Sequence, residues 1–456
     1  MNLSESVFGW TTVGLTGEWL HDALRGNLAV LLGEVAHAYW SSQSAQQLKV
    51  LAVGLGLVWL AYRVVLAWKR SASERARRRK DAERSRRLSR ARRLATYPSS
   101  FPSGWYPVAL STEVTAGQVL HVQALGEDFA VFRSLGAPES VSVLDAYCPH
   151  LGANMAVGGK VKGNCLECPF HGWCFDGETG RATTVPYCEH GAPSNARVRS
   201  WPVREKFGFI CVYYNAAEAA RGAQAAATIG LCTGSHALME DPTYEPMDVP
   251  SVDSGEAVFR GSHEQDVRMH LQEFAENSVD YAHFEPVHGR LLFPFTNTPI
   301  PGCEIQHRAS WSIGEEPHTA YFDDDVFIRV FGRDLRWTGL RARITFSGPG
   351  GMVMFHFPTP LGAVYMFQTH MPMDLLEQRV RFRWYADKYM PRLLVWWVAT
   401  NWITQWAQDL QVWENKLYLR RPALVKNDGP VVQLRRWYNQ FYAAEAINQT
   451  PGKLDW

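Results

Sequence analysis

The sequence predicts an α+β protein in which an all-β domain precedes a larger domain of antiparallel strands and helices, with a membrane-spanning helix ahead of both. Three observations predict this arrangement. Residues 48–68 are almost entirely apolar. Short β-type runs broken by Gly and Ser extend from residue 105 to residue 214. From about residue 255, alternating strand candidates lead to one long helix that begins near residue 390.

The bulk composition indicates a mostly globular chain with no nucleic-acid partner. The 456 residues are enough for two or three domains with sizeable cores. Apolar residues make up 46% and charged residues 20%, and the net charge is +1, so no global field favours nucleic acid. Six of the eight cysteines have no regular spacing, which suits a reduced, cytosol-facing domain better than a disulfide scaffold.

Residues 1–47 form a weakly amphipathic tail, and residues 48–68 are expected to span a membrane. As a helix, the second segment would be about 31 Å long, which matches the core of a bilayer. Lys49 and Arg63 stand near its ends, where their charged groups can reach the interface. The alternative is a buried globular helix.

The segment from residue 69 to residue 100 begins with a dense run of Arg and Lys and ends in a Pro/Ser linker. A solvated charged helix is one interpretation of the basic run. Beside a membrane span, the run indicates the cytoplasmic side and would bind anionic headgroups. We therefore expect a single-pass protein of the endoplasmic reticulum membrane with its catalytic part in the cytosol.

Residues 101–215 are expected to form the all-β domain, with two metal-binding loops at its tip. The first loop contains Cys148 and His150, and the second contains Cys168 and His171. Two thiolates and two imidazoles are the ligand set of a Rieske [2Fe–2S] centre, in which two Cys hold one iron and two His hold the other. A structural zinc site is the alternative. The following aromatic residues favour the cluster because they would keep water away: Phe170, Trp173 and Phe175.

Residues 216–456 are expected to form a catalytic domain with a second metal site. Asn277, Asp280 and His283 are spaced by three and are expected on one side of a helix. Pro286 should end that helix, leaving His288 free to turn back toward His283. His270, close to this motif, is expected at the surface or behind the ligands.

Asp409 is the candidate for the third ligand. On a helical wheel it falls in one narrow arc with three tryptophans, so it should lie on a buried aromatic face; these are Trp402, Trp406 and Trp413. A buried carboxylate is costly unless it is paired or binds a metal. Two His and one carboxylate are the ligands of non-haem ferrous oxygenases. A salt bridge or a hydrogen-bonded cap is the alternative.

These motifs resemble those of a known family. The two cluster loops resemble those of the Rieske non-haem iron oxygenases, and the segment from Glu276 to His288 is similar to their mononuclear iron motif. Respiratory Rieske proteins add a disulfide between the loops, but the matching positions here are Ala153 and Phe170. Within the family, the sequence is similar to the cholesterol 7-desaturases of the Neverland type over roughly residues 100–445.

The resemblance implies a helix-grip catalytic domain, in which a curved antiparallel sheet with helices wraps the pocket. It also implies the ligands, which are Cys148, His150, Cys168 and His171 for the cluster and His283, His288 and Asp409 for ferrous iron. Asn277 and Asp280 would serve catalysis, with Asp280 bridging toward a cluster histidine of a neighbouring subunit in a homotrimer.

The same resemblance implies the reaction and its partners. Cholesterol or a related sterol would lose hydrogens at C7 and C8 to give 7-dehydrocholesterol, with O2 as co-substrate. Because the sequence has no phosphate loop and no dinucleotide motif, electrons would come from NAD(P)H through a separate reductase, with or without a ferredoxin.

Three alternatives stay open on the sequence. A sterol or steroid hydroxylase could use the same scaffold. A plastid oxygenase of chlorophyll breakdown would need an acid-poor transit peptide, whereas acidic residues stand early here, among them Glu5 and Glu18. A non-catalytic electron carrier would contain the cluster alone.

Overall fold

The computed structural model describes residues 54–56, 58, 59, 63, 83, 85–221 and 241–444. The chain divides into two units, Met1–Leu88 and Ser89–Trp456. The described residues of the first unit are helical. No helix in the described part of the chain is long and apolar enough to cross a membrane. The predicted tail over residues 1–47, and most of the predicted span over residues 48–68, lie outside the described residues.

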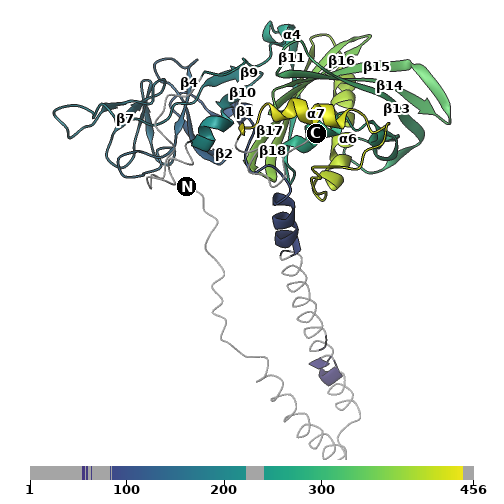
Figure 1. The fold of residues 1–456 in the computed structure, drawn as a ribbon, viewed down its shortest axis with the longest axis horizontal. Coiled ribbons are helices and arrows are strands. Elements are labelled where there is room, and N and C mark those ends of the chain that lie inside the picture. The colour runs from purple at the N-terminus through teal and green to yellow at the C-terminus, as the bar shows by residue number, and fades with distance from the viewer. Residues whose placement is uncertain are drawn as a thin grey trace, which may run out of the picture. The chain divides into compact units, whose positions relative to one another are not determined.

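The second unit begins with an all-β domain that contains three small antiparallel sheets (Figure 1). Two of them have the strand orders β1–β10–β9 and β2–β3–β4. Each strand predicted for this domain falls inside one of these elements, so that expectation is confirmed. Their bounds are β1 (Gly104–Leu110), β2 (Val119–Ala124), β3 (Glu127–Arg133), β4 (Val141–Asp145), β9 (Val203–Lys206) and β10 (Phe209–Tyr214), with a 3₁₀ turn, η1 (Ser111–Glu113), after β1.

Strand β10 ties the all-β domain to the next domain, because both of its faces are buried. Ile210 and Val212 pack into the core of the all-β domain. The alternate residues Phe209 and Cys211 pack against a second cluster that includes Phe367 of the following sheet. This explains why the strand is apolar throughout instead of alternating with polar residues.

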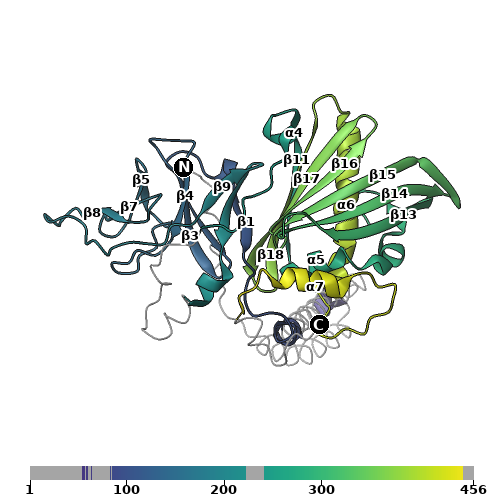
Figure 2. The ribbon, with the colours of Figure 1, turned by 45° about the horizontal axis from the view of Figure 1, so that its top comes forward.

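The third sheet, with the order β5–β6–β7–β8, was not expected from the sequence. Its strands have three residues each and lie in a turn-rich stretch, where a period of two residues cannot be recognised. Their bounds are β5 (Lys160–Lys162), β6 (Cys165–Glu167), β7 (Cys174–Asp176) and β8 (Ala182–Thr184). The sheet lies at the end of the all-β domain farther from the second domain (Figure 2).

The second domain contains one antiparallel sheet of eight strands in the order β11–β18–β17–β16–β15–β14–β13–β12. The sheet curves around one long helix, α6 (Arg392–Trp413), as Figure 2 shows. The expected curved antiparallel sheet with helices is therefore confirmed. Its strands are β11 (Ala257–Val267), β12 (Arg290–Leu292), β13 (Pro299–Ile313), β14 (Thr319–Val330), β15 (Arg333–Ser347), β16 (Met352–Thr359), β17 (Gly362–Asp374) and β18 (Glu377–Asp387).

The inner face of this sheet and helix α6 form the largest hydrophobic core of the described chain. Phe322, Ile344 and Phe355 from three strands pack with Ile403 and Trp406 of α6. The helix begins close to the predicted residue 390. The shorter helices are α4 (Pro250–Asp253), α5 (Leu271–Asn277) and α7 (Val431–Asn439).

The expected single helix through Asn277, Asp280 and His283 is wrong. Helix α5 ends at Asn277, and Asp280 has a non-helical backbone at the start of a 3₁₀ turn, η2 (Tyr281–His283). A π-helical turn, η3 (Phe284–His288), follows and includes Pro286. The Ser278 hydroxyl donates to the carbonyl of Ala275 at 2.7 Å, which competes with continuation of α5.

Candidate metal centres

The two cluster loops share one hydrogen-bonded turn. In each, the N–H of the cysteine donates to the carbonyl five residues later, and the carbonyl of the cysteine accepts from a glycine N–H four residues later. The pairs are Cys148 with Ala153 and Gly152, and Cys168 with Trp173 and Gly172, at 2.8 to 3.1 Å. Both glycines have positive φ, +74° and +72°, which L-residues rarely adopt. Because both loops form this turn, each holds its cysteine and histidine in the same local backbone arrangement.

The turns bring the four predicted cluster residues together. The rings of His150 and His171 are 4.7 Å apart, and Trp173 stacks on His150 at 4.8 Å. Cys148 and Cys168 are buried, whereas the two histidines are half-buried. Of the expected aromatic cover, Trp173 and Phe175 are buried with the two cysteines. Phe170 is 61% exposed, with its ring centroid 3.9 Å from that of His171. The cluster site therefore has its sulfurs inside and its histidines toward solvent.

The donor set fits a binuclear cluster better than a single zinc ion. Burial raises the pKa of the Cys148 thiol to about 12, so its thiolate needs a bound metal. Two thiolates and two imidazoles, arriving as one Cys–His pair from each loop, are the donors of a Rieske [2Fe–2S] cluster.

His283, His288 and Asp409 form the second candidate site. Nε2 of His288 lies 3.1 Å from Oδ1 and 3.2 Å from Oδ2 of Asp409. The rings of His283 and His288 are 5.1 Å apart and nearly perpendicular. Two imidazoles and one carboxylate on one side of a position are the donors that ferrous iron takes in non-haem oxygenases. The structure thus brings together three residues that the sequence places on two distant segments.

The position of Asp409 confirms the predicted buried face of α6. Asp409, Trp406 and Trp413 are each 5% exposed or less. The polar contacts of the carboxylate are with His288 and Asn277. No Lys or Arg in the described chain forms an ion pair with it. The alternative of a simple salt bridge is therefore not what the site shows.

Three further groups orient these side chains. The carbonyl of Asp280 meets Nδ1 of His283, and the Gln408 side-chain oxygen lies 3.3 Å from Nδ1 of His288. The Asn277 amide lies 3.2 Å from Nε2 of His283 and 3.3 Å from Oδ2 of Asp409. Burial lowers the pKa of His283, which favours the neutral imidazole that a metal requires.

Asp280 itself acts through its backbone in this chain. Its side chain is half-buried, and the carboxylate forms no hydrogen bond or ion pair with any residue that the structure describes. No such bond joins it to the described cluster histidines. The cluster loops lie in the all-β domain, whereas α5 lies within the catalytic domain beside α7 (Figure 2).

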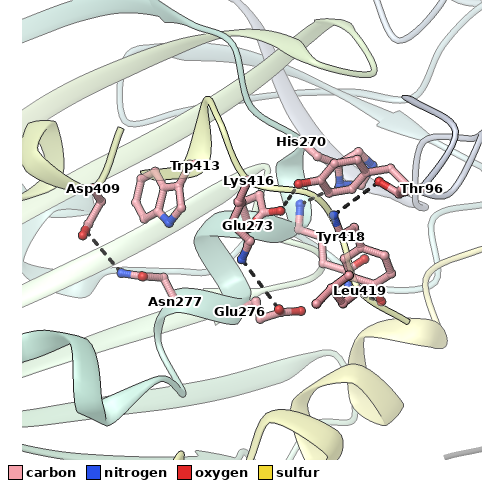
Figure 3. A network of polar contacts seen from close by, with 12 residues as sticks. Thr96, His270, Glu273, Glu276, Asn277, Asp409, Trp413, Lys416, Tyr418 and Leu419 are labelled. Carbon is pink, nitrogen blue, oxygen red and sulfur yellow. Dashed lines mark hydrogen bonds and ion pairs between the residues drawn. The ribbon is translucent and has the colours of Figure 1, made fainter. Parts of the chain in front are cut away.

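A charged network also holds α5 in place, through its residues Glu273 and Glu276 (Figure 3). Lys416 lies 2.6 Å from the Glu273 carboxylate, which also accepts from the Tyr97 hydroxyl. Burial raises the pKa of Glu273. Arg435 donates to both oxygens of Glu276 at 2.7 Å. These contacts join α5, which carries Asn277, to the chain segments that follow α6.

His270 belongs to this network, and its expected surface position is wrong. Its ring is 2% exposed, stacks on Tyr97 at 4.7 Å and accepts from the Gln272 N–H at 3.2 Å. It is therefore the N-cap of α5. The sequence signal was its place just before an apolar helical segment.

Two adjoining cavities lie at and beside the candidate iron site. The first is lined by the three predicted ligands and by aromatic side chains. The second is lined mainly by β13, β14, β15 and α6. Trp402 and Gln405 line both cavities. From the sequence, His307 is expected to be structural or to line a pocket. It lines the second cavity, hydrogen-bonded to Asp324, which the sequence did not single out.

Comparison with known proteins agrees with these sites. Residues 104–202 match the Rieske [2Fe-2S] domain family, and residues 236–442 match the 3-ketosteroid 9alpha-hydroxylase C-terminal domain family. The cholesterol 7-desaturase nvd of Hemicentrotus pulcherrimus is 31% identical, with 81% of this chain and 76% of that protein covered. A probable 3-ketosteroid-9-alpha-monooxygenase oxygenase component from Rhodococcus rhodochrous is 29% identical, with 79% and 86% covered.

Solved structures share the fold at lower identity. Dicamba monooxygenase bound to dicamba has a TM-score of 0.53 at 18% identity, with 76% of this chain and 98% of that chain covered. NdmA of Pseudomonas putida with caffeine has a TM-score of 0.52 at 20% identity, with 74% and 89% covered.

The fold and the two motif matches define an oxidoreductase that uses a [2Fe–2S] cluster and a mononuclear iron, with electrons from NAD(P)H through a reductase. The chain belongs to the Rieske non-haem iron oxygenase family. Its curated relatives include several cholesterol 7-desaturases of the Neverland type at 28–33% identity.

Proposed function

We propose that this chain desaturates cholesterol, or a closely related sterol, between C7 and C8 to give 7-dehydrocholesterol. The observation that carries the proposal is that the His283–His288–Asp409 site lies in an apolar, aromatic-lined cavity, which shares Trp402 and Gln405 with a second apolar cavity. An apolar lining of this kind suits a small apolar molecule. The relatives named cholesterol 7-desaturases support the choice of a sterol.

The proposal assigns each metal to its side chains. Cys148, His150, Cys168 and His171 would hold the cluster, and ferrous iron held by His283, His288 and Asp409 would supply the activation of O2. Asn277 orients Asp409, while Gln408 and the Asp280 carbonyl orient the two histidines. Phe284 and Trp406 line the cavity at the ligands and exclude water. In the overall reaction, the sterol gives up two hydrogens, NAD(P)H supplies two electrons, and O2 leaves as water.

We propose that electrons pass between neighbouring chains of a homotrimer. Within one chain, the cluster loops lie in the all-β domain, whereas α5 lies within the catalytic domain (Figure 2). The half-buried Asp280 carboxylate has no partner in the described part of its own chain. In this proposal it meets a cluster histidine of another subunit, with a reductase and a ferredoxin upstream. Asp280→Asn should then slow reduction at the iron site while leaving cluster reduction by the reductase unchanged.

We also propose a membrane anchor at residues 48–68, with the basic segment after it on the cytoplasmic side of the endoplasmic reticulum. The length and apolar character of the segment support this. A sterol resides in the bilayer, so an anchored enzyme would stay near its substrate.

A hydroxylase is the second candidate, because residues 236–442 match a family named for a steroid hydroxylase. The test uses full-length protein purified without oxygen and supplied with NADPH, a reductase and cholesterol. Mass spectrometry of the product should show the loss of two hydrogens. A product that has gained one oxygen, with no diene, would support the hydroxylase and overturn the desaturase proposal.

A further inference from the structure

A histidine–aspartate pair lies on the inner face of the catalytic sheet, beside the candidate iron site but not among its proposed ligands. His307 on β13 places Nδ1 2.7 Å from Oδ2 of Asp324 on β14. The two side chains are 5% and 3% exposed. Strand alternation explains the position of Asp324, because its neighbours Asp323 and Asp325 point outward and pair with arginines. The pair is therefore a buried polar feature in an apolar wall.

The contacts of Asp324 determine which nitrogen carries the proton when the His307 ring is neutral. Oδ1 of Asp324 accepts the backbone N–H of Arg308 at 3.1 Å, and Oδ2 faces Nδ1 of His307. A carboxylate can only accept, so the proton of the neutral imidazole is on Nδ1. Nε2 is then a bare acceptor.

Nε2 of His307 is buried and has no hydrogen-bond partner among the residues that the structure describes. His370 provides the contrast, because it is also buried but has both nitrogens partnered. Its Nδ1 lies 2.7 Å from the Gln378 oxygen, and its Nε2 lies 3.0 Å from the Gln368 amide. Buried polar atoms are normally paired. A purely structural role for His307 explains the contact between Nδ1 and Asp324. It does not explain why Nε2 is buried without a partner.

The pair borders the cavity next to the candidate iron site. His307 and Asp324 line the second cavity, which shares the wall residue Trp402 with the cavity at the iron ligands. Phe284 stacks on His307 with ring centroids 4.7 Å apart. The rings of His307 and the proposed ligand His288 are 6.4 Å apart. A molecule that extends from the iron site through this cavity would pass the His307 side chain.

We propose that Nε2 of His307 accepts a hydrogen bond from a hydroxyl group of the substrate, and that the His307–Asp324 pair selects an alcohol over the matching ketone. The inference rests on the proposed sterol substrate. A hydroxyl donates to Nε2 and satisfies it. A ketone oxygen would face another acceptor, leaving both buried atoms unpaired, which is costly.

The test measures binding of two sterols that differ only at one oxygen, 5α-cholestan-3β-ol and 5α-cholestan-3-one. The full-length holoenzyme in detergent is titrated with each, and binding is followed through the fluorescence of the cavity tryptophans Trp397 and Trp402. The ketone loses one hydrogen bond and places its oxygen opposite Nε2, so that two acceptors face each other. It should therefore bind about fivefold to tenfold more weakly than the alcohol.

Three variants test whether the His307–Asp324 pair causes the preference for the alcohol. His307→Phe should bind the two sterols with similar affinity. In Asp324→Asn, the Arg308 N–H holds the amide oxygen, so the amide NH2 faces Nδ1 and the His307 proton moves to Nε2. That variant should prefer the ketone. Asp325→Asn, whose side chain pairs with Arg341 on the outer face, is the control and should keep the preference for the alcohol.

Equal binding of the two sterols by the wild type would overturn the inference. So would an unchanged preference for the alcohol in both His307→Phe and Asp324→Asn. Failure of the proposed reaction gives a different result, because a chain that does not desaturate cholesterol would still show the binding preference if the inference is correct.

Discussion

The amide nitrogen of Asn277 lies 3.3 Å from Oδ2 of Asp409, although 132 positions separate the two residues in the sequence. The contact joins the end of α5 to the buried face of α6. It holds the proposed carboxylate ligand against the loop that carries both proposed histidine ligands. The geometry of the iron site therefore depends on how α5 is fixed.

Asn277→Ala should weaken binding of ferrous iron. The variant removes the hydrogen bond that orients Asp409, and loss of such a supporting contact usually costs about tenfold to a hundredfold in metal affinity. Iron titration of protein that keeps its cluster but has lost its mononuclear iron measures the change. Asn415→Ala is the control, because Asn415 is exposed near the end of α6. Equal affinities for the two variants would contradict the role given to Asn277.

Arg435→Met should strongly destabilise the catalytic domain. Arg435 is 2% exposed and forms two hydrogen bonds with Glu276. Removing Arg435 leaves the largely buried Glu276 carboxylate with only the more distant Lys416, at 3.8 Å, at a cost of about 3 kcal/mol in the free energy of unfolding. Urea unfolding followed by tryptophan fluorescence measures it.

The matched control is Arg341→Met, which breaks an exposed pair with Asp325 and should change stability little. The double variant Arg435→Met with Glu276→Gln should recover part of the loss. Similar losses for the two single arginine variants would show that the buried network does not stabilise α5.

His270→Asn should make the protein less sensitive to acid. Burial, followed by the nearby Arg93, lowers the pKa of His270 to about 3 from the ordinary value of 6.5. As the pH falls below about 6.5, the unfolded chain takes up a proton that the folded chain refuses, so stability is lost down to about pH 3. Asparagine can still cap α5 without titrating.

Between pH 7 and pH 5, the wild type should lose about 2 kcal/mol more of its unfolding free energy than His270→Asn. Urea unfolding at the two pH values gives the comparison. The exposed His190→Asn serves as the control. If His270→Asn and the wild type lost stability equally, His270 would not be the source of this acid sensitivity.

Leu55→Lys combined with Leu60→Lys should release the full-length protein from membranes. Each lysine in the middle of a spanning helix costs about 3 kcal/mol on insertion scales. Carbonate extraction of membranes from expressing cells measures the effect. Arg77→Gln with Arg78→Gln, in the basic segment after the proposed span, should leave the protein in the carbonate-resistant pellet. Complete extraction of the wild type would contradict the proposed anchor.

The sequence was most informative where a local pattern determines the position of a residue. The four cluster residues follow from two short motifs, and Asp409 follows from helical periodicity, which α6 confirms. The path from Asn277 to His288 was not predicted correctly, because spacing by three suggests a helix. The chain instead breaks at Asp280 and continues through η2 and η3.

The His307–Asp324 pair could not be predicted, because it depends on the register between two strands. Asp324 lies in a run of three aspartates that resembles an exposed charged segment. Strand alternation turns its side chain inward, and the pairing of Ala309 with Asp324 brings it beside His307. Strand β13 itself was missed, because polar residues on its outer face and Pro and Gly at its start weaken its apolar pattern.

The central claim is that the chain is an oxygenase with its own iron site and not an electron carrier with a cluster alone. The most direct measurement is cholesterol turnover by His283→Ala protein purified without oxygen, with iron and sulfide counted and the cluster spectrum recorded. His356→Ala, outside both sites, is the control. The account predicts about two irons instead of about three per chain, an unchanged cluster spectrum and no product. Wild-type turnover by His283→Ala with its cluster intact would contradict it.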